Sequence, residues 1–168
     1  MSLYTDWRHG RGFGVHSPWA YALITEALRN PCTYYNEQTA RRLMGSRAEA
    51  RAAGAVFRII ARERPSRVTV MGPQEWHSVA ALAGSLTPGG QRMVLVANDR
   101  SDVAEILSAA GDGGIVVIVR PACHADDLVR EIVAKAPRGR AFVLDTLRTL
   151  VIVNLRPDLP DQYLRARF

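Results

Sequence analysis

The sequence predicts one three-layer α/β domain whose mostly parallel sheet ends in an antiparallel hairpin. In the second half of the chain, short runs rich in Val, Ile and Leu alternate with helical segments. This alternation is typical of parallel strands with helices on both faces of the sheet. The chain has 168 residues, of which 48% are apolar, so it is long enough for one domain with a substantial core.

The N-terminal part, residues 1–64, is expected to form an arm followed by helices. Glycines alternate along the arm, which suits an extended strip lying close to another surface. Ser17 followed by Pro18 predicts a capped helix that ends before the next Asn-Pro pair. A second helical region is expected over residues 36–64, with a break near Gly45.

The second helical region carries an arginine stripe beside its apolar side. Because the spacings are near-multiples of a helical turn, the arginines share one side of the helix. We favour a solvated face for the stripe over a phosphate-binding role. The apolar side consists of Ala52, Val56, Ile59 and Ile60, and the stripe consists of Arg47, Arg51, Arg58 and Arg62.

The C-terminal part, residues 65–168, is expected to form the sheet. Only five residues, 145–149, separate the last two apolar runs, too few for a crossover helix, so these strands should pair antiparallel. Strands are predicted at 67–71, 92–97, 115–119, 140–144 and 150–155, with an edge strand at 163–167, and helices at 76–86, 101–110 and 124–135.

The charge balance brings anionic partners into consideration. The formal net charge is +6, and Lys135 is the only lysine, so almost every cation is an arginine. Arginine matches phosphate and carboxylate groups well. Because no RNP, zinc-finger or basic-region motif is present, nucleic acid binding is an alternative that we do not favour.

Other classes of protein lack support in the sequence. Cys32 and Cys123 are far apart and are expected to be free thiols, and no metal-ligand spacing is present, so no metal is expected. No apolar run could span a membrane, and the N-terminus lacks a signal-peptide core. We therefore expect a cytoplasmic protein without membrane contacts.

Two short motifs resemble one family. The chain contains RGFGVHSP at residues 11–18 and closes with LPDQY at residues 159–163 and a terminal Arg-Phe pair. These segments resemble a group of bacterial class I S-adenosylmethionine-dependent methyltransferase-like proteins that open with RGxGxHSPF. The resemblance implies a Rossmann-like, methyltransferase-type fold of reduced size, because this chain has only three strand–helix units.

The resemblance places a cofactor site at the first strand–turn–helix unit, through a motif of the form ExGxxxGxS. Aligned with this motif, the acidic position is Val70, the first glycine is Gly72, the second is Trp76 and the serine is Ser78. Tryptophan would fill the space of the ligand, and valine removes a charged hydrogen-bond partner. We therefore expect no cofactor, with S-adenosylmethionine bound only if the ancestral site survives.

Three further residues are candidates for such a surviving site. The resemblance implies an acidic residue after the second strand that holds ribose hydroxyls, and Asp99 lies there, although a helix N-terminal role is the favoured interpretation. Arg11 and His16 of the arm would complete the pocket. His16 adjoins Ser17, but without a third group or a nucleophile elbow this pair is better explained by helix capping, and no catalytic residue is assigned.

Three functions follow from these features. The favoured one is a degenerate, non-catalytic methyltransferase-like domain that associates with itself or with a protein partner. The alternatives are an atypical S-adenosylmethionine or nucleotide binder and a basic nucleic-acid-binding protein, so the sequence leaves open whether the chain is an enzyme. Because a shortened sheet has an edge that must be covered, a homodimer is expected.

Overall fold

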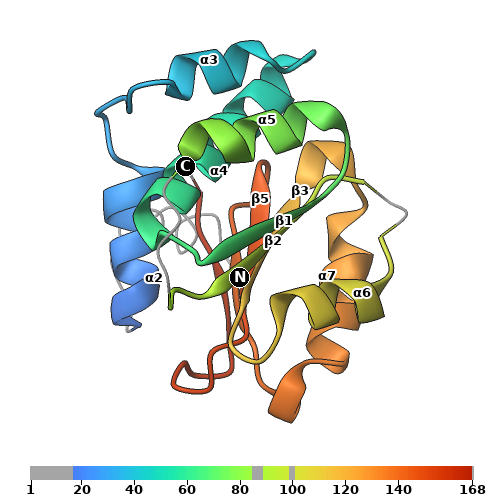
Figure 1. The fold of residues 1–168 in the computed structure, drawn as a ribbon. Helices are drawn as coiled ribbons and strands as arrows, with labels where there is room; N and C mark the ends of the chain where they lie inside the picture. The colour runs from blue at the N-terminus through green and yellow to red at the C-terminus, as the bar shows by residue number, and fades with distance from the viewer. Residues whose placement is uncertain (1–16, 85–88, 99–100, 168) are drawn as a thin grey trace.

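A six-stranded sheet with helices on both faces forms the centre of the molecule (Figure 1). The computed structural model describes residues 17–84, 89–98 and 101–167. Five strands run in one direction and one runs against them. The architecture is thus α/β with a mostly parallel sheet, compatible with a Rossmann-like sandwich.

The antiparallel strand lies inside the sheet. The strand order is β1-β2-β3-β5-β4-β6, and β5 pairs antiparallel with both β3 and β4. The predicted hairpin is therefore confirmed, but its second strand is inserted between β3 and β4 and is buried along its whole length. The strands are β1 Arg67–Met71, β2 Arg92–Val96, β3 Ile115–Val119, β4 Phe142–Asp145, β5 Leu150–Asn154 and β6 Gln162–Arg165.

The N-terminal helices follow the capping signals of the sequence. The Ser17 hydroxyl accepts from the N–H of Ala20 at 3.3 Å, with Pro18 in the first helical position. The Ser46 hydroxyl caps the longest helix by accepting from the N–H of Glu49 at 3.1 Å, and it donates to the Glu49 carboxylate at 2.8 Å, which confirms the break before this helix. The elements are α2 Pro18–Ala22, the π-helix η1 Leu23–Leu28, α3 Glu37–Arg42 and α4 Arg47–Glu63.

The later helices begin at positions that differ slightly from the prediction. The helix predicted from residue 76 begins at Gln74, directly after Pro73. The helix predicted from residue 101 begins at Val103, because the Asp102 side chain caps it by accepting from the N–H of Ala104. The helices are α5 Gln74–Ala83, α6 Val103–Ala110 and α7 Ala125–Ala134, with short 3₁₀ turns at Arg120–Ala122 and Pro137–Gly139.

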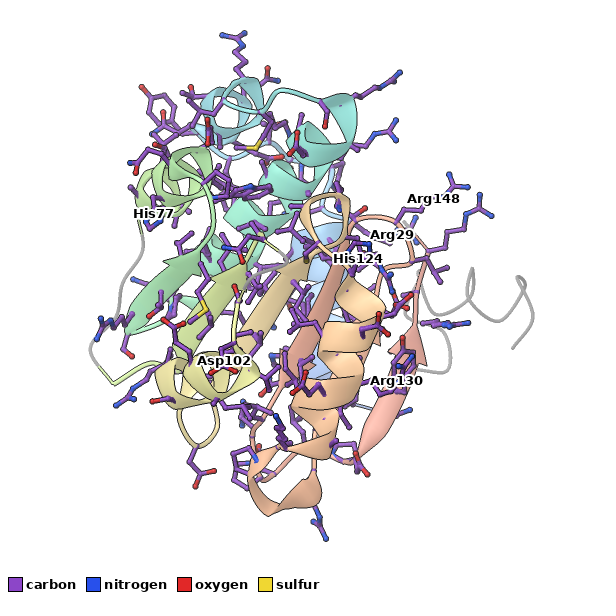
Figure 2. All side chains as sticks on the ribbon, turned by 90° about the vertical axis from the view of Figure 1, so that its right-hand side faces the viewer. Arg29, His77, Asp102, His124, Arg130 and Arg148 are labelled. Atoms are coloured by element: carbon purple, nitrogen blue, oxygen red, sulfur yellow. The ribbon has the colours of Figure 1, made fainter. Side chains whose placement is uncertain are left out.

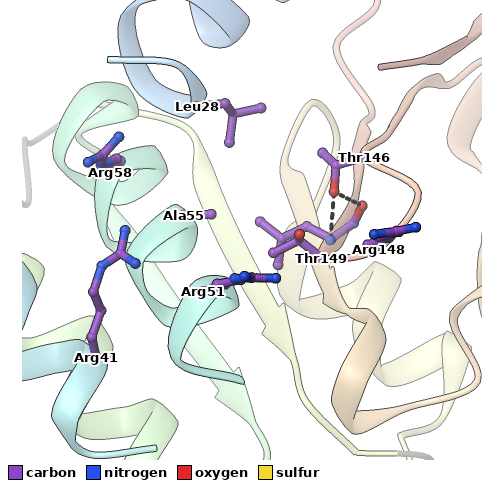
Figure 3. Close-up of a pocket in the computed structure, with 9 residues that line it drawn as sticks. Leu28, Arg41, Arg51, Ala55, Arg58, Thr146, Arg148 and Thr149 are labelled. Atoms are coloured by element: carbon purple, nitrogen blue, oxygen red, sulfur yellow. Dashed lines mark hydrogen bonds between the residues drawn. The ribbon is translucent and has the colours of Figure 1, made fainter. Parts of the chain in front are cut away.

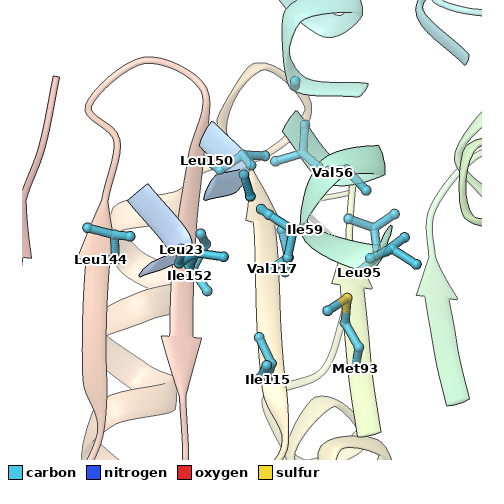
Figure 4. Close-up of a cluster of buried hydrophobic side chains, with 14 of the residues drawn as sticks. Leu23, Val56, Ile59, Met93, Leu95, Ile115, Val117, Leu144, Leu150 and Ile152 are labelled. Carbon is cyan, nitrogen blue, oxygen red and sulfur yellow. The ribbon is translucent and has the colours of Figure 1, made fainter. Parts of the chain in front are cut away.

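Alternate residues of the strands divide the core into two layers. On one face, Met93, Leu95, Ile115 and Val117 pack against η1, α4 and α5 (Figure 4). Their neighbours in the strands pack against α6 and α7 on the other face. Burial of each fully buried Leu, Ile or Val side chain stabilises the folded state by about 1.5–3 kcal/mol. No described helix combines the length and apolar character needed to cross a bilayer.

The chain crosses from strand to strand with two different hands. The steps β1→β2, β2→β3 and β3→β4 all move in the same direction across the sheet. Yet α5 packs on the face of α4, whereas α6 and α7 pack on the opposite face (Figure 1). Crossovers between parallel strands are right-handed in about 98% of cases. With that hand for the connections through α6 and α7, the connection through α5 is left-handed.

Candidate functional site

The junction of β1 and α5 lies at the carboxyl end of the parallel strands. The connection after β1 leads to one face of the sheet, and the connection after β2 leads to the other. Ligands of open α/β sheets bind where neighbouring connections diverge in this way. The topology therefore places the predicted cofactor junction at a position suited to a ligand.

Gly72 brings the ends of β1 and β2 close together. A Cβ at this position would lie 2.9 Å from the Cβ of Ala97, and the N–H of Ala97 donates to the carbonyl of Met71 at 2.8 Å. Gly72 is not among the glycines with positive φ. Its small size therefore serves a close approach of two strand ends.

Trp76 is buried just after this junction. It is the third residue of α5, and its side chain is 2% exposed within the core that α5 shares with α4. Val70, at the position of the motif's acidic residue, packs half-buried against the same core. Two apolar side chains thus stand where the motif has a glycine and a carboxylate.

The remaining predicted site residues are only partly described. The Ser78 hydroxyl donates to the carbonyl of Gln74 one turn earlier, at 3.3 Å. Asp99, Arg11 and His16 lie outside the described residues. Of the predicted set, the structure therefore places Gly72 and Ser78 on one junction and does not place the other three.

A buried carboxylate cluster, which the sequence analysis missed, joins three strands at the same end of the sheet. Asp145 is 1% exposed and accepts from the Arg120 guanidinium at 2.9 and 3.2 Å. It also accepts from the Tyr163 hydroxyl at 2.8 Å and from the N–H of Leu147 at 2.7 Å. Arg120 in turn donates to Asp126 at 2.8 Å. Both carboxylate oxygens of Asp145 are therefore fully engaged by protein groups.

The titration of this cluster follows from its contacts. Burial, together with the hydrogen bond to Asp145, raises the pKa of the Tyr163 phenol. The hydrogen bond from Arg120 holds the pKa of the Asp126 carboxyl below its usual value. A phenol with a raised pKa stays protonated at neutral pH and donates to Asp145, which suits a clamp between strands better than proton transfer.

One signal could have revealed this cluster. Arg120 directly follows a fully apolar strand, and Asp145 ends another. The carboxyl ends of parallel strands meet at one edge, and these two strands lie on either side of β5, so that Arg120 reaches Asp145 past one intervening strand. Their pairing therefore depends on a strand order that the sequence analysis did not predict.

The two described histidines, His77 and His124, do not converge on a metal site. Figure 2 shows His77 on α5 and His124 before α7 on separate parts of the molecule. Within the described ranges, no group of three or more His, Cys, Asp or Glu side chains is placed to hold a metal ion.

Comparison of the chain with known protein families, with curated proteins and with solved structures gave no match in any of the three.

Proposed function

We propose that the chain is a non-catalytic, methyltransferase-like domain that acts by associating with itself or with a protein partner. The observation that carries this proposal is the burial of Trp76 at the position where the cofactor motif requires glycine. A ligand of the ordinary kind would have to displace an indole that is packed in the core.

The connection through α5 supports a shortened sheet. In a doubly wound sheet of order 3-2-1-4-5-6, the helices after strands 1 and 4 lie on opposite faces. Here α5 and α6 also lie on opposite faces, although β1 and β2 follow each other directly in the chain. Loss of two strands beyond β1 accounts for this arrangement. The methyltransferase type itself rests on the motifs at residues 11–18 and 159–163.

Self-association is proposed through the free edge of β1. This strand has one described neighbour in the sheet, and its residues are exposed or half-buried. A second copy could add its own β1 antiparallel about Thr69, with Val68 opposite Val70. In that register Arg67 lies opposite Met71, so no like charges face each other across the pair.

The cofactor part of the proposal is tested by titration with S-adenosylmethionine and S-adenosylhomocysteine. The wild-type chain is expected to show no binding in calorimetry at submillimolar concentrations. The Trp76→Gly variant restores the glycine of the motif and removes the indole, so binding gained by this variant would support loss of an ancestral site.

A second variant distinguishes the effect of removing the indole from the effect of introducing a glycine. Trp76→Ala also removes the indole but gives a smaller gain in backbone freedom than glycine. Both variants are expected to lose about 3–5 kcal/mol of stability, measured by denaturant unfolding. Submillimolar binding of either compound by the wild-type chain contradicts the proposal.

A further inference from the structure

A cavity of about 390 Å³ opens between α4 and the turn that joins β4 to β5, away from the β1–α5 junction. This volume lies in the range of small-molecule sites. Figure 3 shows arginines of α3 and α4 on one side and the turn on the other. The lining residues are Leu28, Arg41, Arg51, Ala55, Arg58, Thr146, Arg148, Thr149 and Leu150.

Two of the arginines are held in place by a buried carboxylate. Glu37 is fully buried, and it accepts from Arg41 at 2.7 and 3.0 Å and from Arg58 at 2.9 Å. Arg58 also donates to the carbonyls of Ala27 and Asn30, near the end of η1. Both guanidinium groups are therefore ordered before any ligand arrives, which lowers the entropy cost of binding.

Gly54 gives Arg41 the room to lie against α4. A Cβ at this mid-helix position would clash with the Arg41 guanidinium. A glycine inside a helix costs roughly 0.5–1 kcal/mol relative to alanine. The helix thus contains a residue of low helix propensity, Gly54, at the point where the missing side chain leaves room for Arg41.

The other two arginines of the cavity have no carboxylate. Arg51 and Arg148 are exposed, and no described residue forms an ion pair with either of them. Figure 3 shows Arg51 extending from α4 toward the turn. The cavity therefore has four guanidinium groups and one compensating carboxylate, Glu37, which leaves three positive charges.

The rest of the lining is suited to a small organic group. Leu28, Ala55 and Leu150 supply apolar surface. The Thr146 hydroxyl is already engaged with the backbone of Leu150 at 2.8 and 2.9 Å, which fixes the turn. The cavity thus combines fixed cations with a limited apolar surface.

We propose that this cavity binds a phosphate monoester with a small apolar body, held by Arg51 and Arg148 and oriented by Arg41 and Arg58. A phosphate monoester carries about −1.5 to −2 charges at neutral pH, which fits the uncompensated charge of the site. Planar guanidinium groups bind its oxygens in pairs. The proposal is independent of the loss of the cofactor site.

Phenyl phosphate is the probe for the test, with inorganic phosphate and benzoate as comparisons. In calorimetry at physiological ionic strength, the wild-type chain is expected to bind phenyl phosphate with a submillimolar dissociation constant. Inorganic phosphate lacks the apolar group and benzoate carries one charge, so each is expected to bind at least tenfold more weakly.

Matched variants locate the site. Arg51→Gln and Arg148→Gln are each expected to weaken phenyl phosphate binding at least tenfold. Arg47→Gln removes an exposed arginine one turn away on α4 that does not line the cavity. The affinity of this variant for phenyl phosphate should therefore stay within twofold of the wild-type value. Ala55→Leu fills the cavity without changing charge and is expected to abolish binding.

Several outcomes overturn the proposal. It is wrong if the wild-type chain does not bind phenyl phosphate at millimolar concentrations. It is also wrong if Arg47→Gln weakens binding as much as Arg51→Gln, because binding would then reflect the general positive charge. Retention of full affinity by Ala55→Leu would place the ligand elsewhere.

Discussion

At the scale of single residues, two buried carboxylates each hold arginines from other parts of the chain. Glu37 joins Arg41 and Arg58 between α3 and α4, and Asp145 joins Arg120 to the end of the sheet. Both carboxylates are almost completely inaccessible to solvent. A buried charge is tolerated only when it is paired and hydrogen-bonded, so each carboxylate depends on its arginines.

Stability in acid should depend on Glu37. Burial opposes ionisation, but hydrogen bonds from Arg58 and Arg41 outweigh it and lower the pKa of the Glu37 carboxyl from its ordinary value of 4.5. The stabilisation is therefore present above pH 4.5 and is lost as the pH falls through the lower pKa of the folded state. Glu37→Gln should cost about 3 kcal/mol at neutral pH, measured by urea unfolding.

The pH dependence distinguishes this effect from simple packing loss. Below pH 4.5 the difference between wild type and Glu37→Gln should shrink, since the wild-type carboxyl also becomes neutral. Asp158→Asn is the control, because the pair of Asp158 with Arg156 is exposed and screened by solvent, so this change should have little effect on stability at any pH in the series. A constant difference from pH 7 to pH 3 would contradict the assigned role of Glu37.

At the scale of elements, α4 shows where helical periodicity predicts well and where it does not. The apolar side is buried as expected. The expectation of a solvated arginine stripe is correct for Arg47 but wrong for Arg58, whose side chain is 11% exposed and pairs with Glu37. Periodicity gives the side of a helix, but the position of α3 decides which arginines are covered.

Replacement of Gly54 should reveal this coupling between α3 and α4. In the wild-type chain, Gly54→Ala displaces the Arg41 guanidinium from Glu37 and should lower the free energy of unfolding by about 1–2 kcal/mol. In an Arg41→Ala background the same change should raise it by about 1 kcal/mol, because alanine favours the helix. Both free energies are measured by denaturant unfolding. Stabilisation by Gly54→Ala in both backgrounds would contradict the prediction, because the Arg41 guanidinium would then move aside without loss of stability.

At the scale of the whole molecule, the two edges of the sheet differ. One edge is formed by β6, which pairs with β4 and carries Tyr163 of the Asp145 cluster. The other edge is formed by β1, whose residues are less buried than those of any inner strand. An unpaired edge can accept a strand from another chain.

The proposed dimer through β1 can be tested by a substitution that spares the sheet. The Met71 carbonyl accepts from β2, so the backbone groups of Thr69 and Arg67 also face β2, and those of Val68 and Val70 face the free edge. Val68→Pro therefore removes an N–H from the free edge alone. The wild-type chain is expected to be a dimer in sedimentation equilibrium, and Val68→Pro a monomer.

Thr69→Pro serves as the contrast to Val68→Pro. It removes a bond between β1 and β2, so it should lower the stability of the chain itself, seen as a loss of helical circular dichroism at a lower urea concentration. A wild-type chain that remains monomeric at high concentration would contradict association through this edge.

The sequence by itself determined the elements and their class. Strand patterns predicted the described strands to within about two residues, and Ser17 predicted a helix start, because capping and periodicity are local properties. It also located the altered junction at Gly72 and Trp76. Only the tertiary structure decided the insertion of β5, the hand of the connection through α5, and the pairing of Glu37 and Asp145 with distant arginines. These features depend on contacts between segments far apart in the chain, which local sequence patterns do not encode.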